Sequence, residues 1–239
     1  GVILVLPLTS RFASLVVWLV PTRENDLTRR LDNSLLNHPA TAIAAAQATL
    51  ADVTDAVFLA IYNTLGPGGA SKISLPDANH AAAELRRYLA KVNTTPSDGQ
   101  VYRDHVRALH AMDHLGRLIV RLGKDQRVQT IREDQELREM GSELAEAVHP
   151  SFSDARETDL AVTRLENLWS KFDQQTAPLR RQTIERSATA EQAIDQAVAR
   201  LDAARWLRRI CYHCWRLCFH LSGREMDTED VEIEPESID

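Results

Sequence analysis

The feature that most restricts the fold is a long apolar stretch, Val198 to Leu221, which contains neither proline nor glycine. Apolar residues recur in it every three or four positions, which is the spacing of one face of an α-helix. Tyr212, Trp215 and Phe219 add a second apolar row, so this helix is expected to pack on more than one side. The third row is basic and consists of Arg205, Arg209, His213, Arg216 and His220. We therefore expect a central bundle helix that carries one basic stripe.

The composition of the whole chain indicates an all-α fold. Ala, Leu, Arg, Glu and Gln dominate, which favours helix, and no alternating run of β-branched residues calls for a sheet. The net charge of −6 argues against a general nucleic-acid binder. The three cysteines all lie between Cys211 and Cys218, which is no disulfide framework and favours a reducing compartment.

The pattern of the central stretch is repeated earlier in the chain. Val106 to Leu122 aligns without a gap on Val198 to Cys214, 92 positions further on, and the apolar positions coincide. In this alignment Arg117 falls on Arg209, and Arg121 falls on His213. A fainter match places residues 83–92 on residues 163–172. The repeat predicts two tandem three-helix units related by duplication, at residues 39–123 and 124–222.

The helix boundaries follow from proline, glycine and capping residues. In the first unit we expect helices at about Pro39 to Leu65, Pro76 to Val92 and Gln100 to Leu122. In the second we expect Asp125 to Val148, then a helix from the Ser153–Asp154 cap past Trp169, with a kink or break at Pro178. A capping box of Thr189 and Gln192 is expected to start the last helix. Residues 22–38 are expected to be a linker with an extended piece at 31–36, and residues 223–239 a disordered acidic tail.

An apolar run, Val2 to Val20, precedes these units. Its length of about 19 residues suits a membrane span, although Arg11 at mid-depth would cost about 2.5–3.5 kcal/mol. Residues 1–21 are either the end of a membrane helix followed by an interfacial piece, or an ordinary buried helix. The membrane interpretation is favoured because the run has no polar face. The basic residues that follow, which favour a cytoplasmic position for the rest of the chain, are Arg23, Arg29 and Arg30.

Four motifs carry a family resemblance. They are Leu19-Val20-Pro21, LDNSLLNHPATAIAAAQATL (Leu31–Leu50), HAMDHLGRL (His110–Leu118) and DAARWLRRICYHCWRL (Asp202–Leu217). Over about residues 2–221 the chain resembles the C-terminal region of bacterial sodium/phosphate cotransporters of the type-II-related class. Its tandem units, each with an arginine in the third helix, resemble the PhoU family.

The resemblance implies a fold, a function and a location. The fold would be a PhoU-like bundle of two three-helix units, preceded by an apolar N-terminal helix. The function would be that of a cytoplasmic regulatory domain without enzymatic activity, with the transporter core upstream of Gly1. Sodium and phosphate would be ligands of the full-length protein, in the bacterial inner membrane, with residues after about 22 in the cytoplasm. The partners implied are the membrane and the transporter core; a homo-oligomer is left open, and no nucleic acid is expected.

The chain departs from the family at the positions of the metal-binding acids. PhoU third helices resemble Glu-Arg-Ile-Gly-Asp, and these acids bind metal clusters in some members. Here only the arginine is kept, as Arg117 and Arg209, while Arg208 and Tyr212 stand at the acidic positions of the second copy. The acidic positions are lost in the first copy too. Because a multinuclear site needs several converging oxygen ligands, no metal and no cofactor are expected.

The basic residues are either an anion site or structural salt bridges. The candidates are Arg117, Arg121, Arg205, Arg209, His213 and Arg216. Arginine suits phosphate recognition. Alternatively, these basic residues form salt bridges with acids of the first helix, Asp52 and Asp55, or with Glu166. We favour the salt bridges.

Two further clusters could form a functional site, but a purely structural role is favoured for each. His110, Asp113 and His114 could hold one divalent metal, but a solvated or salt-bridged face beside Arg117 is favoured because no further ligand is nominated. The three cysteines could bind zinc or act in redox chemistry, but core packing is favoured. There is no phosphate-binding loop, dinucleotide turn or nucleophile elbow. The hypotheses other than a transporter domain are a free-standing PhoU-like adaptor that binds a partner through helix faces, and a metal-binding helical bundle.

Overall fold

The computed structural model describes residues 26–67, 75–124, 126–148, 155–189 and 192–224. All regular secondary structure in these ranges is helical, so the all-α prediction is confirmed. The predictions for the apolar run at 2–20 and for an acidic tail at 225–239 lie outside the described residues.

The first half contains α2 (Pro39–Leu65), α3 (Pro76–Leu89) and α4 (Gln100–Leu122), close to the predicted bounds. Proline opens both α2 and α3, where its missing N–H costs no intrahelical bond. The approach to α2 differs from the prediction: Asn33–Asn37 form a 3₁₀ helix instead of an extended strand. The Asp32 carboxylate accepts a hydrogen bond from the Ser34 backbone N–H at 2.8 Å, which starts this turn.

The second half contains α5 (Arg127–Glu133), α6 (Gln135–Val148), α7 (Ala155–Ala188) and α8 (Ile194–Ser222). The prediction of a single helix from Asp125 to Val148 is wrong, since the helix is interrupted at Asp134. Asp134 has extended backbone, and its carboxylate accepts a hydrogen bond from the Leu137 backbone N–H at 3.1 Å. An aspartate in this geometry caps a new helix, so α6 starts independently of α5.

Two other expectations for this half are also changed by the structure. Of the kink or break expected at Pro178, the break is absent, since Pro178 lies within α7 and does not end it. Phe172 and Leu179 are buried on either side of this proline and hold α7 on the bundle. Thr189 is not a cap for α8: its hydroxyl donates to the Glu185 carbonyl at 3.2 Å, so it follows the last turn of α7. Helix α8 begins at Ile194, without a side-chain cap.

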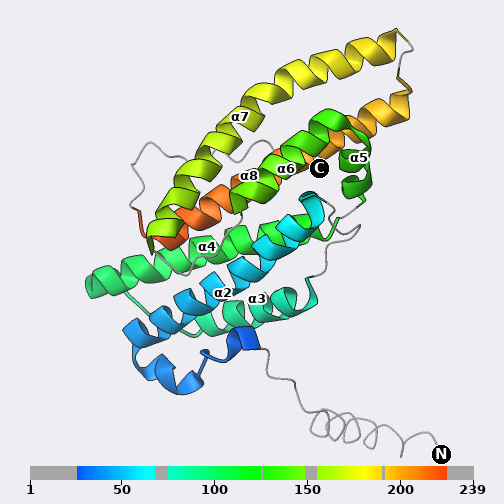
Figure 1. Cartoon of the computed structure of the whole chain (residues 1–239). Helices are drawn as coiled ribbons and strands as arrows, with labels where there is room; N and C mark the ends of the chain where they lie inside the picture. Colours follow the sequence, from blue (N-terminus) through cyan, green and yellow to red (C-terminus); the bar gives the residue numbers. More distant parts are fainter. Residues whose placement is uncertain (1–25, 68–74, 125, 149–154, 190–191, 225–239) are drawn as a thin grey trace, which may run out of the picture.

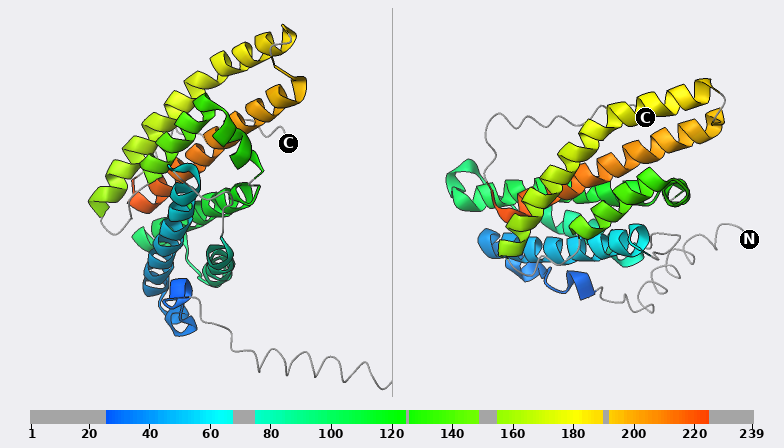
Figure 2. Two further views of the ribbon diagram at one scale, coloured as in Figure 1. Left: turned by 45° about the vertical axis from the view of Figure 1, so that its right-hand side comes forward. Right: turned by 45° about the horizontal axis from the view of Figure 1, so that its top comes forward.

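The helices form two sets that meet along one interface. Helices α2, α3 and α4 pack on one another, and α5 to α8 pack on one another. The sets join where α4 lies against α8 and α2 lies against α6 (Figure 1). The antiparallel pair α7–α8 extends beyond the other helices at one end, as two further views also show (Figure 2).

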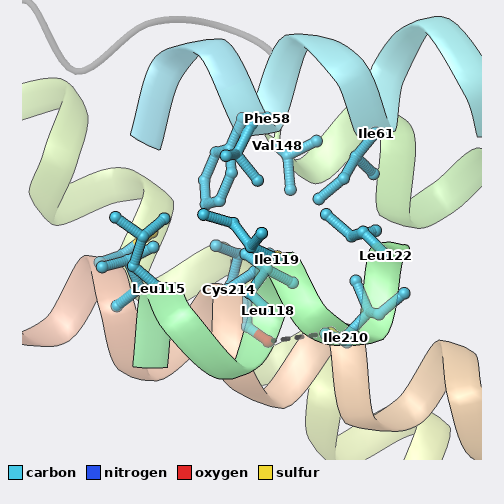
Figure 3. Packing of buried hydrophobic residues seen from close by; sticks show 14 of the residues in the cluster. Phe58, Ile61, Leu115, Leu118, Ile119, Leu122, Val148, Ile210 and Cys214 are labelled. Atoms are coloured by element: carbon cyan, nitrogen blue, oxygen red, sulfur yellow. Dashed lines mark hydrogen bonds between the residues drawn. The ribbon is translucent and has the colours of Figure 1, made fainter. Parts of the chain in front are cut away.

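The core is continuous across this interface. Phe58 and Ile61 of α2 point toward Ile119 and Leu122 of α4, with Ile210 of α8 beneath them (Figure 3). Burying each such side chain contributes roughly 1.5–3 kcal/mol to stability. Helix α8 contacts α4, α5, α6 and α7, so the prediction that it is the central helix is confirmed.

Among the described helices, α2 is the one long and apolar enough to cross a membrane by length and composition. Half of its most apolar window is buried inside the bundle. Core helices of water-soluble proteins have the same composition, so this property does not separate the two cases.

Candidate functional site

A row of basic side chains lies where α4 packs against α8. We call this row the α4–α8 seam; its members are His110, His114, Arg117, Arg121, Arg209, His213, Arg216 and His220. The two helices run antiparallel there, since Arg121 near the end of α4 contacts His213 in the middle of α8, while His110 stacks on His220 near the end of α8. The seam thus contains most of the basic stripe predicted on α8.

Three polar side chains form a chain of hydrogen bonds across the seam. The Arg121 guanidinium donates through Nε to His213 Nε2 at 3.0 Å. Since this ring nitrogen accepts, His213 carries its proton on Nδ1, which lies 3.2 Å from His114 Nδ1. The order of donation is therefore Arg121 to His213 to His114. This assignment requires both imidazoles to be neutral.

Burial and positive charge keep three of the seam histidines neutral: His114, His213 and His220. Burial, followed by the Arg216 guanidinium, lowers the pKa of His114 to about 4. Burial and Arg121 lower the pKa of His213 to about 2, and burial and Arg216 lower the pKa of His220 to about 3. Loss of hydration penalises the charged imidazole, and each neighbouring guanidinium adds repulsion. The imidazoles of His114, His213 and His220 are therefore uncharged at neutral pH, while the seam arginines are positive.

The remaining predicted arginines have different surroundings. Arg117 pairs with Asp113 on its own helix at 2.8 Å. Arg205 is exposed, and its Nε donates to the Leu201 carbonyl at 3.3 Å. Arg216 is buried, with its guanidinium carbon 5.1 Å from the centre of the Phe219 ring. The structure therefore separates Arg205 from the other candidates.

The predicted pairing of the stripe with Asp52 is wrong. Asp52 forms its ion pair with Arg30, which lies in the turn before α2. The pattern of the sequence could not find this partner, because Arg30 precedes the helical repeat. Asp55 does lie near α8, where its charge acts on the Cys218 thiol.

Gly116 of α4 faces the Arg86 side chain of α3. A Cβ atom on Gly116 would lie 2.6 Å from the Arg86 guanidinium. Because Arg86 is exposed and its side chain is flexible, a larger residue at position 116 would require the Arg86 guanidinium to move. Gly116 therefore leaves room for Arg86 between α3 and α4.

The surroundings of the possible metal ligands and of the three cysteines do not favour metal or thiol chemistry. Within the described residues no group of three His, Cys, Asp or Glu side chains could hold a metal ion. Cys211, Cys214 and Cys218 are free and buried in the core. Burial raises the pKa of each thiol, so the thiolate needed for nucleophilic or metal chemistry is disfavoured.

Sequence reasoning missed Arg200, the most completely bonded arginine of α8. Its guanidinium donates to Asp134 at 2.7 Å, to the Thr183 hydroxyl at 2.6 Å and to Glu136 at 2.5 Å. It thereby joins α8 to α7 and to the α5–α6 junction. An arginine on the apolar face of a helix was the available signal, since burial there requires partners.

Contacts across the seam join positions that the internal sequence repeat equates. Arg121 and His213, which the alignment equates, contact each other. The alignment also equates His114 with Trp206. His114 contacts His213, and the two equated residues, Trp206 and Arg121, are in contact as well: the Trp206 indole N–H donates to the Arg121 carbonyl at 2.9 Å. Such reciprocity is the geometry of an interface between two copies related by a two-fold axis.

The seam offers hydrogen bonding and positive charge, and its buried imidazoles are poor bases at neutral pH. It can orient two helix sets against each other and attract anions to its exposed end. Comparisons with protein-family models, with curated proteins and with solved structures give no match.

Proposed function

We propose that the chain is the PhoU-like regulatory domain of a sodium-dependent inorganic phosphate transporter. In this proposal the two three-helix units comprise residues 39–123 and 124–222, and residues 1–21 end the membrane region. The domain lies on the cytoplasmic side of a bacterial inner membrane and biases the transport core. The four sequence motifs support the transporter assignment.

The observation that carries the two-unit arrangement is the reciprocal contact pair across the α4–α8 seam. His114 meets His213, and the equated positions Trp206 and Arg121 also meet. A contact of this kind is expected if both units descend from one ancestor and pack about a two-fold axis. The pairing of α2 with α6 supports the same relation, since α2 is the first long helix of its unit and α6, after the short α5, is the first long helix of the other.

The seam is the place where a signal would pass between the units. Its hydrogen bonds join the third helices and are specific to one register of α4 against α8. A ligand or partner that favours another register would shift the balance between two arrangements by its differential affinity. The seam arginines act in this proposal as structural groups and do not carry transported phosphate.

The test uses the complete reading frame in a bacterial strain that lacks phosphate uptake. We expect sodium-dependent uptake of radiolabelled phosphate, and a several-fold change in its rate for Arg121→Asp at equal protein level. Arg103→Asp is the control, because Arg103 is exposed on the same helix and bonds only with nearby Gln100 in the contacts described. Lack of sodium-dependent uptake by the complete protein would refute the transporter assignment.

A second candidate is an adaptor that binds another protein through helix faces. It is favoured by exposed apolar residues near the far end of the α7–α8 pair: Ile184 is 50% exposed and Ile194 is 72% exposed. This end extends beyond the other helices (Figure 1). In that case Ile194→Lys would abolish copurification of a partner, whereas the transporter proposal expects phosphate uptake by Ile194→Lys to be unchanged.

A further inference from the structure

A cavity of about 370 Å³ lies where α2 and α4 meet the start of α7 and the end of α8. It is separate from the middle of the seam and reaches it only through His220. One wall is apolar and comes from one turn of α2 and one turn of α4. The residues of this wall are Leu50, Ala51, Ala108 and Ala111. Small side chains on both helices leave this space open.

The opposite side of the cavity carries a fixed guanidinium. Arg107 donates through Nη2 to the Asp104 carboxylate and through Nη1 to the Gly223 carbonyl at 2.5 Å. Gly223 ends α8 with φ of +76°, which turns its carbonyl toward α4. Two anchors from different helices therefore hold the Arg107 head at the cavity, with its positive charge near the opening.

His220 supplies the second polar group. It lines the cavity and is only 7% exposed, yet its Nε2 atom has no hydrogen-bond partner among the described residues. A buried imidazole nitrogen without a partner costs free energy unless a ligand or water bonds to it. The ring is held by stacking on His110, with 5.1 Å between ring centres. It can therefore present Nε2 in a fixed direction.

The electrostatics favour an anion of low charge. Burial lowers the pKa of His220 most, and Arg216 and Arg107 add to this shift, so two guanidinium groups bring positive charge to this end of the cavity, where Arg107 also pairs with Asp104. The neutral imidazole can donate one hydrogen bond from Nε2. Asp104 also lines the cavity and would repel a dianion more strongly than a monoanion. The apolar wall would be poorly used by an ion without a hydrocarbon part.

We propose that this cavity binds a small organic monocarboxylate, with the carboxylate at Arg107 and His220 and the hydrocarbon part against Leu50, Ala51 and Ala108. Charge-assisted hydrogen bonds fix the carboxylate, and burial of the hydrocarbon excludes water from them. This site is independent of the transported ion in the function proposed above.

The test measures binding to the whole chain by isothermal titration calorimetry and ligand-observed NMR. The probes are benzoate, phenylacetate and butyrate, with benzamide as the uncharged counterpart of benzoate and inorganic phosphate as the competing anion. We expect saturable binding of at least one carboxylate. Benzamide is expected to bind at least about 10-fold more weakly than benzoate, because it lacks the charge-assisted bonds.

Two variants locate the site. Arg107→Gln should weaken carboxylate binding at least about 10-fold, whereas Arg103→Gln on the exposed side of α4 should leave it unchanged. Ala51→Leu fills the cavity without altering charge and should abolish binding, whereas Ala44→Leu, at an exposed position of α2, should not. Circular dichroism confirms that each variant is folded.

Three results would overturn the proposal. Absence of saturable binding for all three carboxylates at millimolar concentrations would remove it. Tighter binding of phosphate than of every carboxylate would contradict the ligand class. Carboxylate binding that survives both Arg107→Gln and Ala51→Leu would place the ligand elsewhere.

Discussion

Helices α4 and α8 share one apolar spacing but lie in different surroundings. At equated positions, Val120 of α4 is 66% exposed and Tyr212 of α8 is 4% exposed. The difference arises because α7 covers this side of α8, where Trp169 packs against Tyr212 with 5.9 Å between ring centres. The periodicity of a helix defines its faces, whereas its neighbours decide how many of these faces are buried.

A second difference separates the two helices near their starts. Ala108 and Arg200 occupy equated positions, and both are buried. Ala108 lines the cavity proposed to bind a carboxylate. The guanidinium of Arg200 instead bonds to three side chains. Helix α4 thus borders a cavity at this position, whereas α8 carries an ionic network at the equated one.

The largest expected effect comes from breaking this network. Arg200→Ala should lower the free energy of unfolding by about 3 kcal/mol or more, since it removes the guanidinium from two carboxylates and a buried hydroxyl. Urea unfolding measures the loss. Arg205→Ala, on the exposed side of the same helix, should change stability by less than about 0.5 kcal/mol. Equal effects of the two substitutions would contradict the special role of Arg200.

The contrast between Tyr212 and Val120 predicts unequal costs for truncation at equated positions. Tyr212→Ala should cost about 3 kcal/mol, because it opens a space among buried aromatic rings. Val120→Ala should cost less than about 0.5 kcal/mol, because its side chain is mostly in water. Thermal unfolding of the two variants tests this pair, and a similar cost at both sites would show that α7 does not cover α8 as described.

Acid should destabilise the seam. The folded-state pKa values of His114 and His220, about 4 and 3, lie below the ordinary value of 6.5, so the unfolded chain binds these protons first. Stability therefore falls as pH drops below about 6.5, by on the order of 1 kcal/mol per histidine per pH unit. The fall continues down to the folded pKa values. His213, with a pKa of about 2, contributes in the same direction.

Unfolding measured between pH 7 and pH 5 tests this expectation. His114→Asn should reduce the slope of stability against pH. Asn79→Ala is the control, because Asn79 is exposed on α3 and its side chain does not titrate. A slope that His114→Asn does not alter would contradict the neutral, buried state of this imidazole.

The smallest effect concerns the equated arginines of the third helices. Arg117→Ala should cost only about 0.3–0.5 kcal/mol, since its partner Asp113 is one turn away on the same exposed surface. Arg209→Ala should cost more, about 1 kcal/mol, because Arg209 is half-buried on the central helix. Unfolding of the double variant shows whether the two effects add, as they should if the arginines act separately.

The candidate site was predictable only in part. The repeated basic spacing placed His213 and Arg216 on one side of α8, and both lie in the α4–α8 seam. The partner of Asp52 was not predictable, because Arg30 belongs to an irregular approach with no periodicity. The role of Arg200 was hidden for a related reason: its partners Asp134 and Glu136 flank a helix break that an uninterrupted helical pattern did not indicate.

The sequence by itself determined the all-helical class, the bounds of α2 and α4, and the central position of α8. These follow from local causes: apolar spacing, proline at helix starts and glycine after helix ends. Only the tertiary structure decided which histidines lie together, which side chain lies beside Gly116, and where the cavity beside Arg107 lies. The physical reason is that helical periodicity operates over a few residues, whereas burial, pKa and ion pairing depend on side chains that arrive from other helices.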